Sequence, residues 1–520
     1  MNPTQVFLYD TTLRDGTQGE GISFSVQDKI RIAEKLDGFG ISYIEGGWPG
    51  SNPKDIEFFR QAAQRRWRQA KICAFGSTCR PKADPTSDAQ VKLLLEAQTP
   101  VVTIVGKAWR LHVEEILGIN VEENERMIRA TVRCLKAEGR EVIFDAEHFF
   151  DGYKDGREDA LRALRAAAEG GADVIVLCDT NGGSLPDEVG EVTVRTICEL
   201  GVPIGIHTHN DGELAVANAL AAVRAGAVQL QGTVNGYGER TGNCNLTSAI
   251  PNLQLKLGLE VVPDLTRLRE LSLFVDELAN CPHNVRAPFV GSTAFTHKGG
   301  LHVHAVQKLA CSYEHIEPAA VGNRQHIVVS ELSGQSNVIG KARELGFSFE
   351  KNSPQVGAIL HEVKRLEHLG YEFEAAEASF ELLIRRVLTS PPPLWELIEY
   401  HCSYIHSVRN RFESCEATVK LKVDGDDIYT VAEGDGPVNA LDAALRKALV
   451  PVFPDIEHIL LEDYKVRIIG THQGTGSRTR VLVDSTDHHE TWCTVGVSDN
   501  VIEASWLALC ESYEYRLRKA

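Results

Sequence analysis

The stretch VFLYDTTLRDGTQ, residues 6–18, shows the pattern that decides the fold of this chain. Its first half is apolar through Tyr9, as expected for a strand that is buried on both faces of a parallel sheet. Its second half is polar and contains Arg14, Asp15 and Gln18. In parallel barrels the carboxyl ends of the strands carry the chemistry, so these residues mark a candidate site.

The same pattern recurs up to about residue 257, and amphipathic helical stretches separate its copies. Each copy is apolar in its middle and polar or small at its end. The eight strand candidates are VFLYD (6–10), ISYIEGG (41–47), KICAFGS (71–77), PVVTIVGK (100–107), EVIFDAE (141–147), DVIVLCD (173–179), PIGIHTH (203–209) and AVQLQGTV (227–234). Alternating strands and helices of this number predict an α/β fold, a (β/α)₈ TIM barrel.

The rest of the chain follows other patterns. The segment VGAILHEVKRLEHLG (356–370) is amphipathic, and the prolines at 391–393 cannot continue a helix. A rough repeat of strand and helix follows, in YTVAEGDGPVNALDAALRKAL (429–449) and WCTVGVSDNVIEASWLALCESYEYRL (492–517). We therefore expect a catalytic barrel over 1–275, helical linker subdomains over 276–410, and a C-terminal α+β domain for regulation or dimerisation over 411–520.

Composition excludes several classes of function. A net charge of −18 over 520 residues disfavours nucleic acid as a partner, because phosphate backbones select a basic face. No window approaches the roughly 20 apolar residues that cross a bilayer, and the first residues lack a basic and apolar leader, so we expect no membrane contact and a cytoplasmic location. The 12 cysteines form no CxxC pair, which favours reduced thiols over disulfides or a zinc ribbon.

A metal site is predicted from three residues at strand ends. His207 and His209 lie in HTHND, where their spacing sends both imidazoles to one face of a strand, and Asp15 follows the first strand. One carboxylate and two imidazoles suit Mn²⁺, Zn²⁺, Co²⁺ or Mg²⁺. A pair of satisfied polar histidines is the more common meaning of an isolated HxH. The position at the barrel mouth favours the metal.

Further polar residues follow the other strands. Arg14 could stabilise an oxyanion or form a structural ion pair; Glu147 could act as an acid or base and Thr180 as a hydroxyl donor to a carboxylate. Asp10 and Glu45 are expected to hold Arg14 or backbone amides in place. Gln18 is a weaker candidate for substrate binding.

Two loops add candidates. The glycine-rich GTVNGYGERTGNCNL (232–246) can bring Asn243 to a metal or its water. The segment THKGGLHVHAV (296–306) contains His302, which could reach the barrel mouth as an acid or base. A solvated surface position is the alternative for its neighbours His297 and His304.

Together, DTTLRDGTQ, HTHND, GERTGN and GLHVHAV resemble the acyl-CoA condensing branch of the DRE-TIM metallolyases, which includes 2-isopropylmalate, homocitrate and citramalate synthases. The resemblance covers nearly the whole chain, because the C-terminal part is similar to the leucine- or isoleucine-sensing domain of isopropylmalate synthases. Within the branch, YIEGGWPGSNPKD (43–55) resembles the citramalate synthase group.

The resemblance implies a divalent metal on Asp15, His207 and His209 with Asn243 near the coordination sphere. It implies that Arg14 stabilises the oxyanion, and that Arg14, Gln18 and Thr180 bind the substrate. Glu147 and His302 would handle protons. The implied reaction is acyl transfer with conversion of the acyl group to an alkyl group: acetyl-CoA condenses with pyruvate, and thioester hydrolysis releases citramalate and CoA, the first step of the pyruvate route to isoleucine. A homodimer with isoleucine as feedback inhibitor is implied for the C-terminal domain. His304 stands where some relatives carry an acidic residue and is given no role.

Two other functions stay open at this point. The first is another enzyme on the same scaffold, either a 2-isopropylmalate or homocitrate synthase that takes a larger 2-oxo acid, or a lyase. The second is a catalytically silent amino-acid sensor that keeps the barrel as a scaffold. Intact Asp15, His207 and His209 argue against the sensor.

Overall fold

The structure is a computed structural model that describes residues 5–328, 335–350, 353–407, 412–469 and 477–519. The chain divides into two compact units. The first comprises residues 1–295 and 316–324, and the second comprises residues 296–315 and 325–520.

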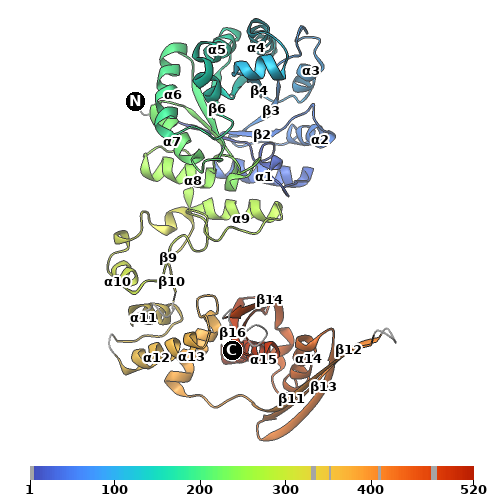
Figure 1. The fold of residues 1–520 in the computed structure, drawn as a ribbon, viewed down its shortest axis with the longest axis vertical. Helices are drawn as coiled ribbons and strands as arrows, with labels where there is room; N and C mark the ends of the chain where they lie inside the picture. The colour runs from blue at the N-terminus through green and yellow to red at the C-terminus, as the bar shows by residue number, and fades with distance from the viewer. Residues whose placement is uncertain (1–4, 329–334, 351–352, 408–411, 470–476, 520) are drawn as a thin grey trace. The chain divides into compact units, whose positions relative to one another are not determined.

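The first unit is built on a closed barrel of parallel strands in sequential order, β1 to β8 (Figure 1). The strand β1 pairs with both β2 and β8, which closes the ring. All eight strands lie within the stretches predicted from the sequence, so the predicted TIM barrel is confirmed. Their bounds are β1 Phe7–Asp10, β2 Tyr43–Gly47, β3 Lys71–Ser77, β4 Val101–Lys107, β5 Glu141–Glu147, β6 Val174–Asp179, β7 Ile204–Thr208 and β8 Gln229–Gly232.

Helices surround the strands on the outside of the barrel (Figure 1). Local sequence sets where they begin and end. Ser25 and Asp28 form a capping box at the start of α1, and Gly40 ends that helix in the left-handed region with φ 111°. The bounds are α1 Val26–Phe39, α2 Pro53–Ala62, α3 Ala89–Glu96, α4 Val121–Ala137, α5 Phe149–Gly170, α6 Pro186–Leu200, α7 Ala215–Ala225, α8 Leu246–Pro251 and α9 Leu268–Leu278. Short helical turns are η1 Gly16–Gln18, η2 His112–Ile116, η3 Val234–Gly236, η4 Asn252–Lys256, η5 Leu265–Arg267 and η7 Pro318–Val321.

The barrel has two separate apolar layers, because successive side chains of a strand point to opposite faces. The outer layer lies between the strands and the helices. The inner layer fills the barrel and consists of Tyr9, Tyr43, Cys73, Val101, Ile143, Val176 and Cys178. The next inward positions toward the carboxyl ends of β2, β4, β5 and β8 are polar or charged, namely Glu45, Thr103, Asp145 and Gln231, and form part of the floor of the barrel mouth.

The second unit contains helices and two three-stranded antiparallel sheets, β11-β12-β13 and β14-β15-β16. Each sheet is followed by a helix that packs on it, α14 on β12 and β13 and α15 on β15 and β16. The predicted repeat of strands and helix is therefore present. The bounds are β9 Thr296–His297, α10 Gly300–Lys308, η6 Ala310–Ser312, β10 His326–Ile327, α11 Gln335–Glu344, α12 Pro354–His368, α13 Glu377–Thr389, β11 Glu396–Ser407, β12 Phe412–Val423, β13 Asp426–Gly434, α14 Pro437–Leu449, η8 Pro454–His458, β14 Leu460–Ile469, β15 Arg478–Thr486, β16 Thr491–Ser498 and α15 Val501–Lys519.

One boundary differs in detail from the sequence pattern. The strand β11 lies inside the range 276–410 that the sequence assigned to helical linker subdomains, yet it pairs with β12 along its length. The three domain ranges as a whole stay a prediction. Among the described residues, no helix combines the length and the apolar composition that a membrane crossing requires.

Candidate metal centre and active site

Three residues from two strand ends form a compact group at the barrel mouth. Asp15, His207 and His209 each offer one ligand atom, and these atoms all lie within 4.8 Å of one another. His207 Nε2 is 3.2 Å from His209 Nε2 and 3.5 Å from Asp15 Oδ2. All three side chains are buried. The backbone explains the convergence, because β7 directs alternate residues to one face and the turn after β1 folds Asp15 back over the mouth.

The atoms around this group fit a cation. Asn243 lies beside it, its backbone bridged to that of His209, and its buried Oδ1 has no hydrogen-bond partner among the described residues. A buried oxygen acceptor without a donor is costly unless a cation or water completes it. One carboxylate oxygen, two imidazole nitrogens and an amide oxygen form a donor set typical of divalent ions.

The pKa values of Asp15 and His209 also favour metal binding. Burial raises the pKa of Asp15, but the charges of Arg14, His207 and His209 outweigh it and leave the pKa below its usual value. Burial, followed by the proximity of His207, lowers the pKa of His209 to about 3. Asp15 is therefore an anion and His209 a neutral imidazole at neutral pH, the forms in which both can bind a metal.

Arg14 is fixed on three sides. Its Nε donates to Glu45 Oε1 at 2.6 Å, and its Nη1 lies 3.6 Å from Asp15 Oδ2. Its guanidinium carbon stands 3.7 Å from the centre of the Phe75 ring, a cation–π contact. Burial lowers the pKa of Arg14, but the charges of Glu45 and Asp15 raise it further, so the cation is permanent. The result is a fixed positive charge beside the candidate metal site.

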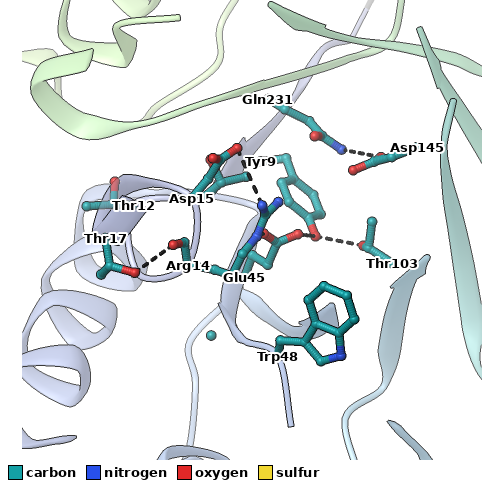
Figure 2. A network of polar contacts seen from close by, with 12 residues as sticks. Tyr9, Thr12, Arg14, Asp15, Thr17, Glu45, Trp48, Thr103, Asp145 and Gln231 are labelled. Carbon is teal, nitrogen blue, oxygen red and sulfur yellow. Dashed lines mark hydrogen bonds and ion pairs between the residues drawn. The ribbon is translucent and has the colours of Figure 1, made fainter. Parts of the chain in front are cut away.

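A hydrogen-bonded network below Arg14 holds this arrangement (Figure 2). The Tyr9 hydroxyl donates to Glu45 Oε2 at 2.6 Å and lies 2.7 Å from the Thr103 hydroxyl. Both oxygens of Glu45 are thus occupied, one by Tyr9 and one by Arg14. Asp10 holds a backbone amide, one of the two roles expected for it: its Oδ1 accepts a hydrogen bond from the backbone N–H of Thr12 at 3.0 Å.

The candidate proton-transfer and carboxylate-binding residues lie at neighbouring strand ends. Glu147, at the end of β5, is paired with Lys107, at the end of β4. Thr180 follows β6, and its Oγ accepts the backbone N–H of His148 at 2.8 Å. That contact uses the hydroxyl oxygen as an acceptor, so the Thr180 proton is available to a substrate carboxylate.

Two other predicted residues are exposed. Gln18 ends the turn η1 and its side chain is exposed. His302 lies on α10 in the second unit, exposed, and stacks on the ring of Tyr313 with 4.3 Å between ring centres. A role for His302 at the barrel mouth therefore stays a prediction. His297 contacts Glu314, with 3.1 Å between Nε2 of His297 and Oε1 of Glu314.

Sequence reasoning missed several residues at the floor of the mouth. Asp145 and Gln231 are buried and hydrogen-bonded to each other, Nε2 of Gln231 donating to Oδ1 of Asp145 at 3.0 Å (Figure 2). Burial, followed by the charge of Glu45, raises the pKa of Asp145 to about 8. A usable signal existed, because Asp145 stands two residues before Glu147 on the same strand and so shares its inward face. Lys107 could also have been predicted, because it is a charged residue at the carboxyl end of its strand.

Comparison with known families covers almost the whole chain. The HMGL-like family matches residues 5–275, the homocitrate synthase post-HMGL domain-like family matches residues 289–370, and the LeuA allosteric (dimerisation) domain matches residues 374–517.

Full-length relatives narrow the assignment. The (R)-citramalate synthase of Aquifex aeolicus (strain VF5) is 53% identical over 99% of this chain and 98% of its own. That of Geobacter sulfurreducens is 51% identical over the same shares. The chain belongs to the citramalate synthase family. By contrast, the probable 2-isopropylmalate synthase of Methanopyrus kandleri is 32% identical over 97% of this chain and 96% of its own.

Membership of the citramalate synthase family makes the chain an enzyme of the condensing, acyl-transferring kind and does not favour a silent sensor or an isopropylmalate synthase. The HMGL-like match, over residues 5–275, includes the segment that carries Asp15, His207 and His209.

Proposed function

We propose that this enzyme condenses acetyl-CoA with pyruvate and hydrolyses the resulting thioester, releasing (R)-citramalate and CoA. The observation that carries the proposal is the group of Asp15, His207 and His209 with the fixed cation of Arg14 beside Asp15. A divalent ion bound there would supply Lewis acidity toward the ketone of a 2-oxo acid. The identity of the ion, among Mn²⁺, Zn²⁺, Co²⁺ and Mg²⁺, belongs to the same proposal.

The residues around the site have roles that follow from their positions. The Thr180 hydroxyl donates to the pyruvate carboxylate, and Gln18 contributes to binding at the rim. A carboxylate base, Glu147, takes a proton from the acetyl methyl group, and the enolate carbon attacks the ketone carbon of pyruvate. Arg14 stabilises the negative charge that moves to the ketone oxygen, and His302 returns a proton to it. Water then cleaves the thioester, and the thiol of CoA leaves with a proton.

The substrate is tested by the rate of thiol release from acetyl-CoA with a panel of 2-oxo acids. We expect pyruvate to give a kcat/KM at least tenfold above 2-oxobutyrate, 2-oxoisovalerate and 2-oxoglutarate, because one extra methylene in a fitted pocket changes binding by about 1–3 kcal/mol. A preference for 2-oxoisovalerate or 2-oxoglutarate would overturn the pyruvate assignment and leave the condensing chemistry intact.

The metal ligands are tested by the metal content of purified His207→Ala and Asp15→Asn variants. We expect both to lose the ion and the activity together. His283→Ala is a matched control, because His283 contacts Asp276 in the same unit, away from the three proposed ligands. Unchanged metal content in His207→Ala would refute the ligand assignment.

We propose in addition that the second unit forms a homodimer and mediates feedback inhibition by isoleucine. Supporting this, Val466 and Ile468 of the edge strand β14 remain 47% and 65% exposed although Val466 pairs with the fully buried Val481. A second copy of the chain would cover this apolar strip. Inhibition by isoleucine but not by leucine or valine, with dimers by sedimentation, is the expected result. Equal sensitivity to all three amino acids would contradict the choice of effector.

A further inference from the structure

His207 and His209, the two histidines of the candidate centre, are held differently. His207 directs Nε2 toward Asp15 and His209, so Nε2 is the nitrogen that faces a metal. A nitrogen can bind a metal only through its lone pair, which places the ring proton of His207 on Nδ1. Nδ1 of His207 lies 3.0 Å from Oε1 of Gln231. By contrast, Nδ1 of His209 is buried and has no partner among the described residues.

The Gln231 amide makes two further side-chain contacts. Its Nε2 donates to Oδ1 of Asp145 at 3.0 Å and to Oε1 of Gln229 at 3.4 Å. In this arrangement the NH₂ group of Gln231 faces Asp145 and Gln229, and its carbonyl oxygen faces the ring of His207. Figure 2 shows the side chains of Gln231 and Asp145 directed toward each other.

The three side chains in this chain of contacts are all buried. Asp145 is 4% exposed, Gln231 is 0% exposed and His207 is 6% exposed. Water therefore cannot replace a lost hydrogen bond easily, and an unsatisfied buried polar group costs about 1–3 kcal/mol. The three side chains come from β5, β8 and β7, which makes the contact a property of the barrel itself and independent of its loops.

We propose that Gln231 is a positioning residue for the metal centre: held by Asp145, it accepts the Nδ1 proton of His207 and so keeps the Nε2 lone pair directed at the ion. This inference rests on the proposed metal site. Hydrogen-bond acceptors behind ligating histidines fix the tautomer and the ring orientation, and their loss lowers metal affinity by about 10- to 100-fold. Gln231 touches neither substrate nor metal and acts through His207.

The test measures Co²⁺ affinity of the full-length protein by competition with a chelating dye. Gln231→Leu removes the acceptor and should weaken Co²⁺ binding by roughly 10- to 100-fold. Gln231→Glu keeps an acceptor for the Nδ1 proton and should restore most of the affinity. Gln229→Leu is the matched control, because Gln229 is an equally buried amide on the same strand, makes no hydrogen bond to His207, and its replacement removes only the longer 3.4 Å contact of Gln231 while the 3.0 Å contact with Asp145 remains. It should leave the affinity within about twofold of wild type.

A spectroscopic measurement separates positioning from a loss of folding. In the Co²⁺ protein the exchangeable Nδ1 protons of both ligating histidines are shifted far from other resonances. We expect one to exchange slowly with solvent in wild type and Gln229→Leu, and to exchange fast in Gln231→Leu. The metal-free proteins should unfold at similar denaturant concentrations.

The outcomes separate this inference from the proposal beneath it. Wild-type affinity in His207→Ala would overturn the metal site itself. Weak binding in His207→Ala together with wild-type affinity in Gln231→Leu would overturn the positioning role alone, as would equal losses in Gln231→Leu and Gln231→Glu with no change in proton exchange.

Discussion

Arg14 and Glu45 form an ion pair in which Nε of the guanidinium donates to the carboxylate at 2.6 Å, with Glu45 fully buried. Because Tyr9 occupies the other oxygen of Glu45, the carboxylate cannot turn away, and the guanidinium keeps its remaining N–H groups directed toward Asp15 and the mouth. The pair converts a long, flexible side chain into a fixed cation at the place where a ketone oxygen would gain charge.

Replacement of Arg14 by lysine tests whether the contacts of the guanidinium with Glu45 and Phe75 are needed for activity. Lysine keeps the charge but lacks the planar fork that binds Glu45 and stacks on Phe75. We expect kcat for thiol release to fall by roughly 10²- to 10³-fold, as for the loss of one oxyanion donor. Metal content measured on the same preparations should stay unchanged. A parallel loss of metal and activity would mean that Arg14 supports the ligand site and not the oxyanion.

Glu147→Gln should slow the step in which the acetyl methyl group loses its proton. The expected fall in kcat is about 10²- to 10⁴-fold, the usual contribution of a general base. Exchange of the methyl protons of acetyl-CoA with D₂O, measured by NMR in the presence of a non-reacting pyruvate analogue, should fall in parallel. Glu114→Gln is the control, because Glu114 also pairs with a cation, Arg110, but on the exposed surface. Methyl exchange at the wild-type rate in Glu147→Gln would assign the base elsewhere.

The barrel and the ends of its strands could be predicted from the sequence because the pattern there is local. An apolar run followed by charged residues shows both the strand and its functional end, which is how Asp15, His207 and Glu147 were found. Asp145 and Gln231 are different, because they interrupt the interior of apolar strands, and their meaning depends on the partner that a distant strand brings to them. Gln231 and Asp145 are 86 positions apart. The start of β11 before the predicted domain boundary has a similar cause, since its pairing with β12 is the contact that defines it.

The face of β14 that helix α15 leaves uncovered leads to a prediction about assembly. Val466 and Ile468 are more than 45% exposed, whereas Val481, the cross-strand neighbour of Val466, is fully buried beneath the helix layer. Ile468→Asp places a charge on this strip and should convert a dimer into a monomer at micromolar concentration, as measured by sedimentation velocity. Leu185→Asp, at an apolar position of the barrel unit that is 62% exposed, is the control and should stay dimeric. Dimers of Ile468→Asp with wild-type affinity would place the interface elsewhere.

Asp10 should make stability depend on pH in a direction opposite to that of most carboxylates. Burial raises the pKa of Asp10 to about 7, although its hydrogen bonds from Thr12 oppose the shift. The unfolded chain releases this proton near pH 3.9, whereas the folded chain keeps it until about pH 7. Between these values the folded state binds more protons, so the contribution of Asp10 to the free energy of unfolding falls as pH rises through this window and is constant above it.

Asp10→Asn removes this dependence while preserving the shape of the side chain. The variant should gain stability over the wild type as pH rises from about 4 to about 7, by a few kcal/mol at most, since one pKa unit corresponds to about 1.4 kcal/mol. Denaturant unfolding of both proteins in a chelator, at intervals of one pH unit, measures the difference. Asp187→Asn, at an exposed position of α6, should show no such trend. A stability difference between Asp10→Asn and wild type that stays constant across this window would show that the buried carboxyl ionises normally and that water or a cation reaches it.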